Sequence, residues 1–592
     1  MKKLIGAVLF SLVLLASFTA SANSLPPLRV SDPFGEVTAG TCMPLYVITW
    51  GGEYAVIHAN GDAAHTTPNS LFGKAGLCFD LIHEDSPEKQ LSGYVTGKTA
   101  LLRGTVGMGV AGNEFLLFDS RLQPVAVILL TRSTGGDALV VGPGISTLAN
   151  LVNKLIALQK YGPHMDFLIA TLKFAGLSMK DVKIVWTSGL TGEDKDKPSD
   201  ALLEKRADAA FVITFDANTL SSGGTVGTGS EGSLKGARTI FTTKSVDHAT
   251  FDVYYARADY LATHRDALGK FAELIMVSQA ELIALNKAKG PGWKAAVTAF
   301  QKILSKTVPD YASAQDMFMD CTPAGLALNE KFFTDPNFMR NFDTVVSEIQ
   351  DAYIELGALT KKMPMKHAGW DYAALKRGGT LSYQAATPKF DEAKVTAVVS
   401  ELDRSGTLDE RLMDKPIEVL FSPNEEKFDI APFKPHFDGL LAKLAVAGGS
   451  LMVIEGHADP LGYLKCLKAS KDPAYAAKMD KELASKGGIV AACLSKNPGP
   501  AELARVKQAA KNKSAMRAYA VRDAFIAYAR EKKLTFDPTQ FTINPSGIEK
   551  PKSGMCGEIP CAPKTDADWR ANMRVLFKVI QVEAEASTFE AL

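Results

Sequence analysis

Short apolar runs alternate with amphipathic helical stretches over residues 25–377, and this alternation limits the fold more than any other feature of the chain. Such alternation is typical of α/β layers, so we expect α/β layers with largely parallel sheets. Residues 221–236 are rich in Gly, Ser and Thr and predict an exposed loop. The expected strands are residues 125–131, 138–141, 182–187 and 209–214, and the expected helices are residues 146–161, 165–175, 201–206, 256–288, 293–304 and 338–356.

A second pattern begins near residue 416. Residues 378–415 contain Gly, Thr and Pro turn signals around one helical stretch, residues 392–402, and predict a linker. The order β-α-β-α-β that follows predicts a small α/β sandwich over residues 416–592. Its expected strands are residues 417–421, 450–455 and 574–582, and its expected helices are residues 435–447 and 514–532.

Residues 1–22 have the order of a secretory signal peptide. Lys2 and Lys3 precede an apolar run, residues 4–18, and a small-residue stretch follows that ends at Ala22. The run is shorter than the roughly 18 to 20 residues that a membrane span needs. No cysteine follows it directly, which argues against a lipoprotein anchor. We expect cleavage after Ala22 and export to the periplasm, against the alternative of a buried N-terminal helix.

The charge of the chain is balanced. The formal net charge is +1, and loss of Lys2 and Lys3 leaves 64 basic residues (66 − 2) against 65 acidic ones, or −1. A balanced chain has no general attraction to nucleic acid. We found no convincing metalloprotease, nucleophile-elbow or nucleotide-binding motif, and the Gly-rich stretch 222–225 lacks the Lys-Ser/Thr of a phosphate loop. We therefore expect no enzyme, no cofactor and no metal site.

Seven cysteines are present, and export permits disulfides. Sequence spacing cannot fix their connectivity, so the pairing stays open. Cys321 is expected to be a buried free thiol. The candidate pairs are Cys42 with Cys78, Cys466 with Cys493, and Cys556 with Cys561.

Four motifs of the C-terminal part carry a family resemblance. Residues 454–462, IEGHADPLG, resemble the G-H-T-D-x-x-G signature of OmpA-like peptidoglycan-binding domains. Residues 516–521 resemble that family's R-A-x-x-V helix, residues 547–551 its G-x-x-x-P loop, and residues 572–575 its terminal N-R-R-V. The motifs occur in the family's order over residues 416–592.

This resemblance implies a binding site for the diaminopimelate of the peptidoglycan stem. Asp459 and Arg517 correspond to the family's acid and base, and Asn572 and Arg574 belong to its terminal motif. A carboxylate suits the ammonium of an amino-acid end, and a guanidinium binds its carboxylate in a forked geometry. For Asp459 the alternative is a turn cap, and for Arg517 a surface helix residue. Three positions depart from the family pattern: Ala458, Met573 and Leu576.

A basic insertion also departs from the family pattern. Residues 463–513 carry eleven Lys or Arg against four acids. They could cap the binding cleft, attract anionic wall polymers, or form a solvated helical excursion.

The N-terminal part is similar to type 2 periplasmic solute-binding proteins, in particular the branch for nitrate, sulfonate, taurine and thiamine-precursor uptake. The resemblance lies in the strand and loop at residues 45–54, in residues 100–106 with 112–114, in residues 161–164, and in residues 201–210. Lys205 stands where the family's last motif has Gly.

The resemblance implies two α/β lobes with a cleft between them. Residues 25–130 and 239–377 would form lobe one, the middle segment lobe two, and two crossovers the hinge. Ligands of such folds bind at strand ends and helix N-termini. Glu53 and Asp216, if they faced the cleft, would favour a ligand with an amine over a plain anion. The candidate ligand-binding residues are Trp50, Glu53, Tyr54, Asn113, Ser133, Thr134, His164, Thr214 and Asp216.

The sequence leaves three functions open. The first is periplasmic capture of a small solute, with the C-terminal domain holding the protein to peptidoglycan. The resemblance implies an ABC permease as the usual partner, although wall attachment also suits sensing or scavenging. The second is a structural or sensory envelope protein whose main activity is wall binding. The third, an enzyme, has no motif in its favour.

Overall fold

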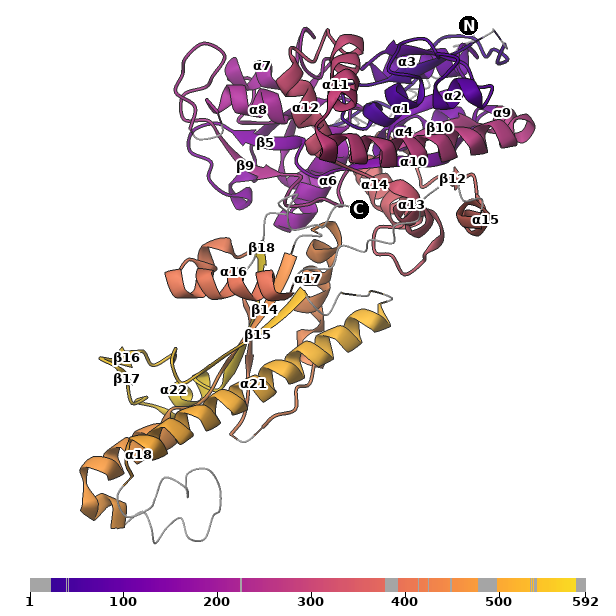
Figure 1. The fold of residues 1–592 in the computed structure, drawn as a ribbon. Coiled ribbons are helices and arrows are strands. Elements are labelled where there is room, and N and C mark those ends of the chain that lie inside the picture. The colour runs from indigo at the N-terminus through magenta and orange to yellow at the C-terminus, as the bar shows by residue number, and fades with distance from the viewer. Residues whose placement is uncertain are drawn as a thin grey trace, which may run out of the picture.

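The computed structural model describes residues 23–38, 40, 42–223, 226–377, 392–413, 415–423, 425–447, 450–477, 498–532, 534, 536 and 540–581. The expected signal peptide, residues 1–22, lies outside these residues. Figure 1 shows a two-lobed N-terminal part above a smaller C-terminal domain, with a long helix along the latter. Among the described helices, none is long and apolar enough to cross a membrane.

Lobe one combines the start and the end of the N-terminal part. Its main sheet has the order β11-β4-β10-β3, with β12 beside β4, and a separate parallel pair, β1 and β2, lies next to it. The strands are β1 (Met43–Val47), β2 (Phe79–His83), β3 (Leu101–Thr105), β4 (Pro124–Ser133), β10 (Phe251–Arg257), β11 (Cys321–Pro323) and β12 (Lys366–His367). The helices are α1 (Glu53–Ala59), α2 (Leu71–Lys74), α3 (Pro87–Val95), α4 (Val106–Ala111), α5 (Asn113–Leu116), α9 (Ala258–Thr263), α10 (Arg265–Ala288), α11 (Pro291–Ile303), α12 (Tyr311–Met319), α13 (Gly325–Thr334), α14 (Phe342–Glu355) and α15 (Tyr372–Arg377).

Lobe two is a five-stranded sheet of order β7-β6-β8-β5-β9. Alternate side chains of its strands enter two cores. Leu139 and Phe211 join the large core that includes helix α6, while Val140 and Val212 pack in a small-residue core under α7 and α8. The elements are β5 (Asp137–Val141), β6 (Leu155–Gln159), α6 (His164–Ala175), β7 (Lys183–Thr187), α7 (Pro198–Leu203), β8 (Ala209–Ile213), α8 (Thr214–Leu220) and β9 (Arg238–Thr242).

Two crossovers join the lobes, one between β4 and β5 and one between β9 and β10. Thr243 fastens them together, because its Oγ1 lies 2.7 Å from Ser133 Oγ and accepts from the N–H groups of Gly135 (3.1 Å) and Asp137 (3.2 Å). The two crossovers expected from the sequence are therefore present, at residues 134–136 and 243–250.

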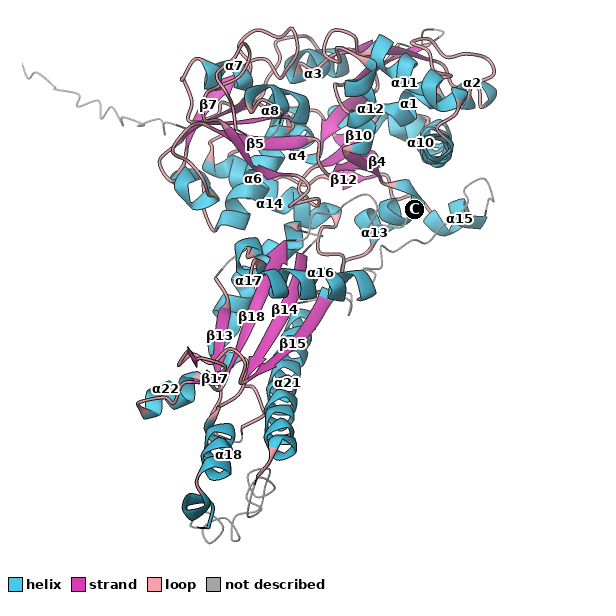
Figure 2. Cartoon of the chain, turned by 60° about the vertical axis from the view of Figure 1, so that its left-hand side comes forward, coloured by secondary structure: helices cyan, strands magenta, loops and turns pink. Residues whose placement is uncertain are grey.

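The C-terminal domain is a four-stranded sheet, β13-β18-β14-β15, with helices on both faces (Figure 2). Leu451 and Val453 face α16, whereas Met452 and Ile454 face α17 and α21, as strand alternation requires. Helices α18 and α21 extend side by side beyond the sheet. The elements are α16 (Glu392–Ser405), β13 (Ile417–Leu420), α17 (Lys434–Val446), β14 (Ser450–His457), α18 (Leu461–Lys471), α21 (Pro500–Glu531), β15 (Phe541–Gly547), β16 (Met555–Cys556), β17 (Ile559–Pro560), α22 (Asp566–Ala571) and β18 (Arg574–Gln581).

Two expectations about secondary structure were wrong, and several strands were not expected. Residues 146–161 form a short 3-10 turn and strand β6, because the apolar run of Leu155–Gln159 is buried between β7 and β8. The main sheet of lobe one is antiparallel across β11, β4, β10 and β3, rather than parallel. Strands β2, β9, β10 and β15 were not expected, and in β15 a proline, Pro545, interrupts the alternating run FTIN.

Two of the three candidate disulfides are present in the described residues. Cys42 bonds to Cys78 and so links β1 to β2, and Cys556 bonds to Cys561 across the hairpin β16–β17. Cys321 is a buried free thiol, as expected. The candidate pair of Cys466 with Cys493 is not described, because Cys493 lies outside the described residues.

Candidate functional site

A cavity lies between the two lobes, beside the crossovers. Its volume is about 20 Å³, enough for roughly one water molecule. Lobe one contributes Ile48, Thr49, Trp50, Asp85, Met108, Thr250 and Asp252, and lobe two contributes Asp137, Pro163, Leu190 and Ile213. The cavity is therefore small in this closed arrangement, and it is a feature of the two lobes together.

Three of the lining residues are aspartates, and none is lysine or arginine. Asp85 follows strand β2 and accepts from Thr49 through N–H (2.7 Å) and hydroxyl (2.6 Å). Asp137 begins strand β5, and its Oδ1 lies 3.0 Å from Nε2 of the fully buried His164. Asp252 comes from strand β10 and accepts from the Thr131 hydroxyl at 2.9 Å.

Beneath the cavity, one buried arginine forms ion pairs with two acids. The Arg103 guanidinium forms an ion pair with Glu53, and its Nη1 lies 3.2 Å from Asp252 Oδ1. Burial raises the pKa of Glu53 to about 7, against the lowering effect of Arg103. Burial also raises the pKa of Asp252. A single cation thus neutralises two carboxyl groups that are cut off from water, which makes the second ionisation costly.

Two further lining residues shape the cavity. Trp50 is 6% exposed, and its indole N–H donates to Thr131 Oγ1 at 3.0 Å. The outer edge of the indole lies against the first crossover, where a Cβ on Gly136 would come within 2.3 Å of Trp50 Cη2. Thr250 is 3% exposed, and its hydroxyl has no hydrogen-bond partner among the described residues.

The structure places some of the predicted ligand-binding residues near the cavity. Trp50 lines it, and Glu53 and His164 lie directly behind it as partners of Arg103 and Asp137. Ser133 and Thr134 belong to the first crossover.

The other predicted residues have different surroundings. Tyr54 stacks on Phe300 in the core of lobe one, with ring centroids 3.9 Å apart, and its hydroxyl donates to the Ala314 carbonyl. Asn113 donates to the Pro364 carbonyl, and Thr214 to that of Gly135. Asp216 accepts from Thr191 at 2.6 Å and does not line the cavity.

The sequence analysis missed four polar lining residues, Thr49, Asp85, Asp137 and Thr250. It also missed Asp252, although this acid stands inside an otherwise apolar strand, FDVYYAR. A charged residue in a buried run is a usable signal, because burial without a partner is costly. The other four occupy loop or strand-end positions that no local pattern distinguishes.

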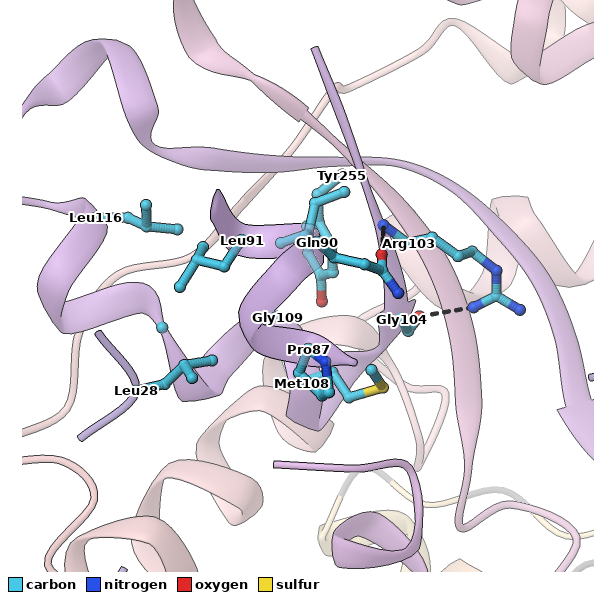
Figure 3. A pocket seen from close by; sticks show the side chains of 12 residues that line it. Leu28, Pro87, Gln90, Leu91, Arg103, Gly104, Met108, Gly109, Leu116 and Tyr255 are labelled. Atoms are coloured by element: carbon cyan, nitrogen blue, oxygen red, sulfur yellow. Dashed lines mark hydrogen bonds between the residues drawn. The ribbon is translucent and has the colours of Figure 1, made fainter. Parts of the chain in front are cut away.

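A second cavity, of about 10 Å³, lies within lobe one (Figure 3). Leu91, Leu116 and Tyr255 give it an apolar wall. Arg103 closes one side and donates to the Gly104 carbonyl at 3.1 Å, the dashed contact in Figure 3. Met108 lines both cavities, so the two are neighbours.

One group of possible metal ligands occurs in the described residues, Cys42 with His65 and Cys78. The two cysteine sulfurs are bonded to each other. The group therefore leaves His65, whose Nδ1 lies 2.7 Å from Asp80, as its one available ligand.

In the C-terminal domain, the residues of the expected wall-binding site lie where β14 ends and α21 passes. Asp459 accepts from Leu461 N–H at 2.9 Å at the start of α18, and burial raises its pKa. Arg517 is 1% exposed, and its guanidinium donates to the carbonyls of Glu425 (3.0 Å) and Ser422 (3.2 Å). Asp459 and Arg517 interact electrostatically.

Asn572 and Arg574 have positioning contacts instead. Asn572 is fully buried and accepts from the N–H groups of Lys552 (2.6 Å) and Ser553 (3.4 Å). Arg574 donates to the carbonyl of Lys550 at 3.2 Å. Both residues hold the loop that follows β15.

No family model of known proteins matches the chain, and no curated protein matches it. Solved structures are similar at low identity. The periplasmic aliphatic sulphonate binding protein SsuA from Escherichia coli is 14% identical, with 59% of this chain and 98% of that chain covered and a TM-score of 0.38. The alkanesulfonate-binding protein SsuA from Xanthomonas axonopodis pv. citri is 13% identical, with 56% of this chain and 100% of that chain covered and a TM-score of 0.37. The periplasmic nitrate-binding protein NrtA from Synechocystis PCC 6803 is 13% identical, with 57% of this chain and 85% of that chain covered and a TM-score of 0.36. Identities and scores this low carry no conclusion about the ligand of this chain.

Proposed function

We propose that this chain is an exported binding protein, not an enzyme, which captures a small solute between its two lobes in the periplasm. The observation that carries the proposal is the interlobe cavity, whose polar lining comes from both sides of a two-crossover hinge. A ligand that contacts both lobes stabilises the closed arrangement relative to an open one. A site between two lobes also buries most of the surface of the ligand.

Separation of the two lobes about the crossovers would let a ligand enter the cavity. The closed cavity holds about one water molecule, so entry of a larger solute needs the lobes to separate about the crossovers. Opening would break the contact in which Gly107 N–H of lobe one donates to Asp166 of lobe two at 3.1 Å. A permease of the ABC type would be the partner that receives the solute.

The proposed second activity is attachment to peptidoglycan through the C-terminal domain. It is supported by the four OmpA-like motifs and by the proximity of Asp459 to Arg517. In the present conformation the Arg517 guanidinium is occupied by two backbone carbonyls, so stem binding would need the segment around Ser422 to move. A wall-bound envelope protein without a solute is the alternative function.

Solute capture is tested by thermal unfolding of the full mature chain against a broad panel of small solutes. A solute that binds the folded state at about 100 times its Kd adds roughly 2.7 kcal/mol to the free energy of unfolding. The expected result is a concentration-dependent rise in Tm for one chemical class. A flat response across anions, amines, zwitterions and pyrimidines would favour the alternative.

Wall attachment is tested by sedimentation of the same chain with purified peptidoglycan. The variant Asp459→Asn should remain in the supernatant. Asp429→Asn is a matched control, because Asp429 likewise accepts from the backbone N–H two residues later, Ala431, at 3.0 Å. Equal sedimentation of both variants with the unmodified chain would contradict the proposed role of Asp459.

A further inference from the structure

The charges around the interlobe cavity are unbalanced. Asp85, Asp137 and Asp252 line it, and Glu53 lies behind Asp252. The buried arginine beneath them, Arg103, is shared between two of these four acids. Asp85 and Asp137 have histidine and hydroxyl partners instead.

Three lysines interact electrostatically with residues around the cavity, but none of them lines it. Lys244 and Lys306 are exposed, and Lys197 donates to the Gly192 carbonyl at 2.5 Å. Lys244 interacts electrostatically with Asp320, a half-buried acid next to the crossover. The three carboxylates of the cavity wall therefore have as cationic partners one arginine, which is shared with Glu53, and two histidines that carry charge only when protonated.

A second observation, independent of charge, indicates a bound molecule. The Thr250 hydroxyl is buried, lines the cavity and has no partner among the described residues. A buried hydroxyl without a hydrogen bond costs about 1 to 3 kcal/mol. A ligand with an N–H or O–H group would supply the partner.

The remaining wall also suits a cation. Trp50 presents an indole to a site from which water is largely excluded. Indole rings attract ammonium groups, and more strongly when both are desolvated. Apolar Ile48, Leu190 and Ile213 would cover a short carbon chain.

We propose that the solute captured between the lobes is a small organic cation with an amine, whose ammonium lies among Asp85, Asp137 and Asp252 and donates to Thr250. This inference deepens the proposed function and depends on it. It differs from the nitrate and sulfonate among the ligands that the sequence resemblance suggests, because an anion would meet three carboxylates and no lysine or arginine at the cavity wall.

The test is isothermal titration of the full mature chain with probes of one carbon skeleton: butylamine, 1,4-diaminobutane, butyrate and butane-1-sulfonate. We expect at least one amine to bind and both anions to fail. Asp137→Asn and Asp252→Asn should each weaken amine binding tenfold to hundredfold, as the loss of a charge-assisted hydrogen bond does. Asp208→Asn is the control and should leave the affinity unchanged, because Asp208 does not line the cavity and precedes β8 at the end away from Ile213, where it accepts from Leu155 N–H at 3.0 Å.

The outcomes separate the two proposals. Binding of an anion but of no amine overturns the inference and leaves solute capture in place. Amine binding that is equal in Asp137→Asn, Asp252→Asn and the unmodified chain also overturns it, since the amine then binds elsewhere. If none of these probes and none of the wider thermal panel binds, solute capture itself fails. Circular dichroism of each variant distinguishes lost binding from lost folding.

Discussion

At the residue scale, one buried acid stands apart, because Asp166 forms no ion pair among the described residues. Asp166 is 2% exposed, and one of its carboxylate oxygens has no partner in the described residues. The other oxygen accepts from Gly107 N–H of the opposite lobe. Burial raises the pKa of Asp166 from the ordinary 3.8 to about 7.

The first prediction concerns pH. Because the folded state holds the Asp166 proton up to a pH of about 7 and the unfolded state releases it near 4, the folded state binds more protons in between. The contribution of Asp166 to stability is therefore present below pH 4 and lost as the pH rises to 7. Asp166→Asn should remove this loss and raise the free energy of unfolding at pH 8 by about 1–3 kcal/mol relative to the unmodified chain.

The measurement is urea unfolding of both proteins from pH 4 to pH 8. Their difference should grow with pH and level off above pH 7. A constant difference would show that Asp166 is ionised in the folded state throughout this range.

At the element scale, close packing of strand β14 on helix α21 makes the C-terminal domain sensitive to one glycine. A Cβ on Gly456 would lie 2.1 Å from the Ser514 carbonyl oxygen, which belongs to helix backbone and cannot yield easily. Gly439 in helix α17 has no neighbour within 4 Å of its Cβ position. The two positions form a matched pair.

The second prediction is that Gly456→Ala lowers the free energy of unfolding by about 1–3 kcal/mol, as overpacking does. Gly439→Ala should raise it by roughly 0.5–1 kcal/mol, because alanine restricts the unfolded chain and suits a helix interior. Chemical unfolding followed by circular dichroism measures both. Equal effects at the two positions would mean that β14 and α21 are not in close contact.

The third prediction compares the two described disulfides. Cys42–Cys78 closes a separation of 36 residues and Cys556–Cys561 one of 5. The chain-entropy relation gives losses of about 4 and about 2 kcal/mol when each pair is changed to serine. Thermal unfolding of the two double variants should show the larger drop in Tm for Cys42–Cys78; the reverse order would indicate that native-state contacts outweigh loop entropy.

At the scale of the whole molecule, the C-terminal domain docks on the two-lobed part at the hinge. Helix α17 packs against α6, and its last residue, Val446, is 1% exposed within the core of the lobes. The Val446 carbonyl accepts from His248 N–H at 3.3 Å, and His248 lies in the second crossover. Figure 1 shows α17 at this junction.

The fourth prediction is that Val446→Asp separates the two parts, because a charge in this apolar contact has no partner. Calorimetry should then show two unfolding transitions further apart than in the unmodified chain, and small-angle scattering a larger radius of gyration. Met516→Asp, at an apolar position of α21 that is 45% exposed, is the control and should change neither. An unchanged radius for Val446→Asp would show that the docking does not depend on this contact.

Prediction from sequence succeeded where the signal is local. The spacing of apolar residues predicted helix α6 and strands β7, β8 and β14 to within two residues at each end. It failed for β6, because a short apolar run fits helix and strand equally well until its neighbours are known. It also failed for the direction of the lobe-one sheet, since antiparallel β4 and β10 are separated by the whole of lobe two.

The sequence by itself determined the α/β class and elements such as α6, β7, β8 and β14, because the periodicity of apolar residues is a local signal. The tertiary structure alone decided the site. Asp85, Asp137 and Asp252 are far apart in sequence and meet because the crossovers bring two sheets edge to edge. Tyr54 and Asn113 have the residue types of ligand contacts, but packing turns both into the core. Which polar side chain faces a cavity depends on long-range packing, and no local pattern contains that information.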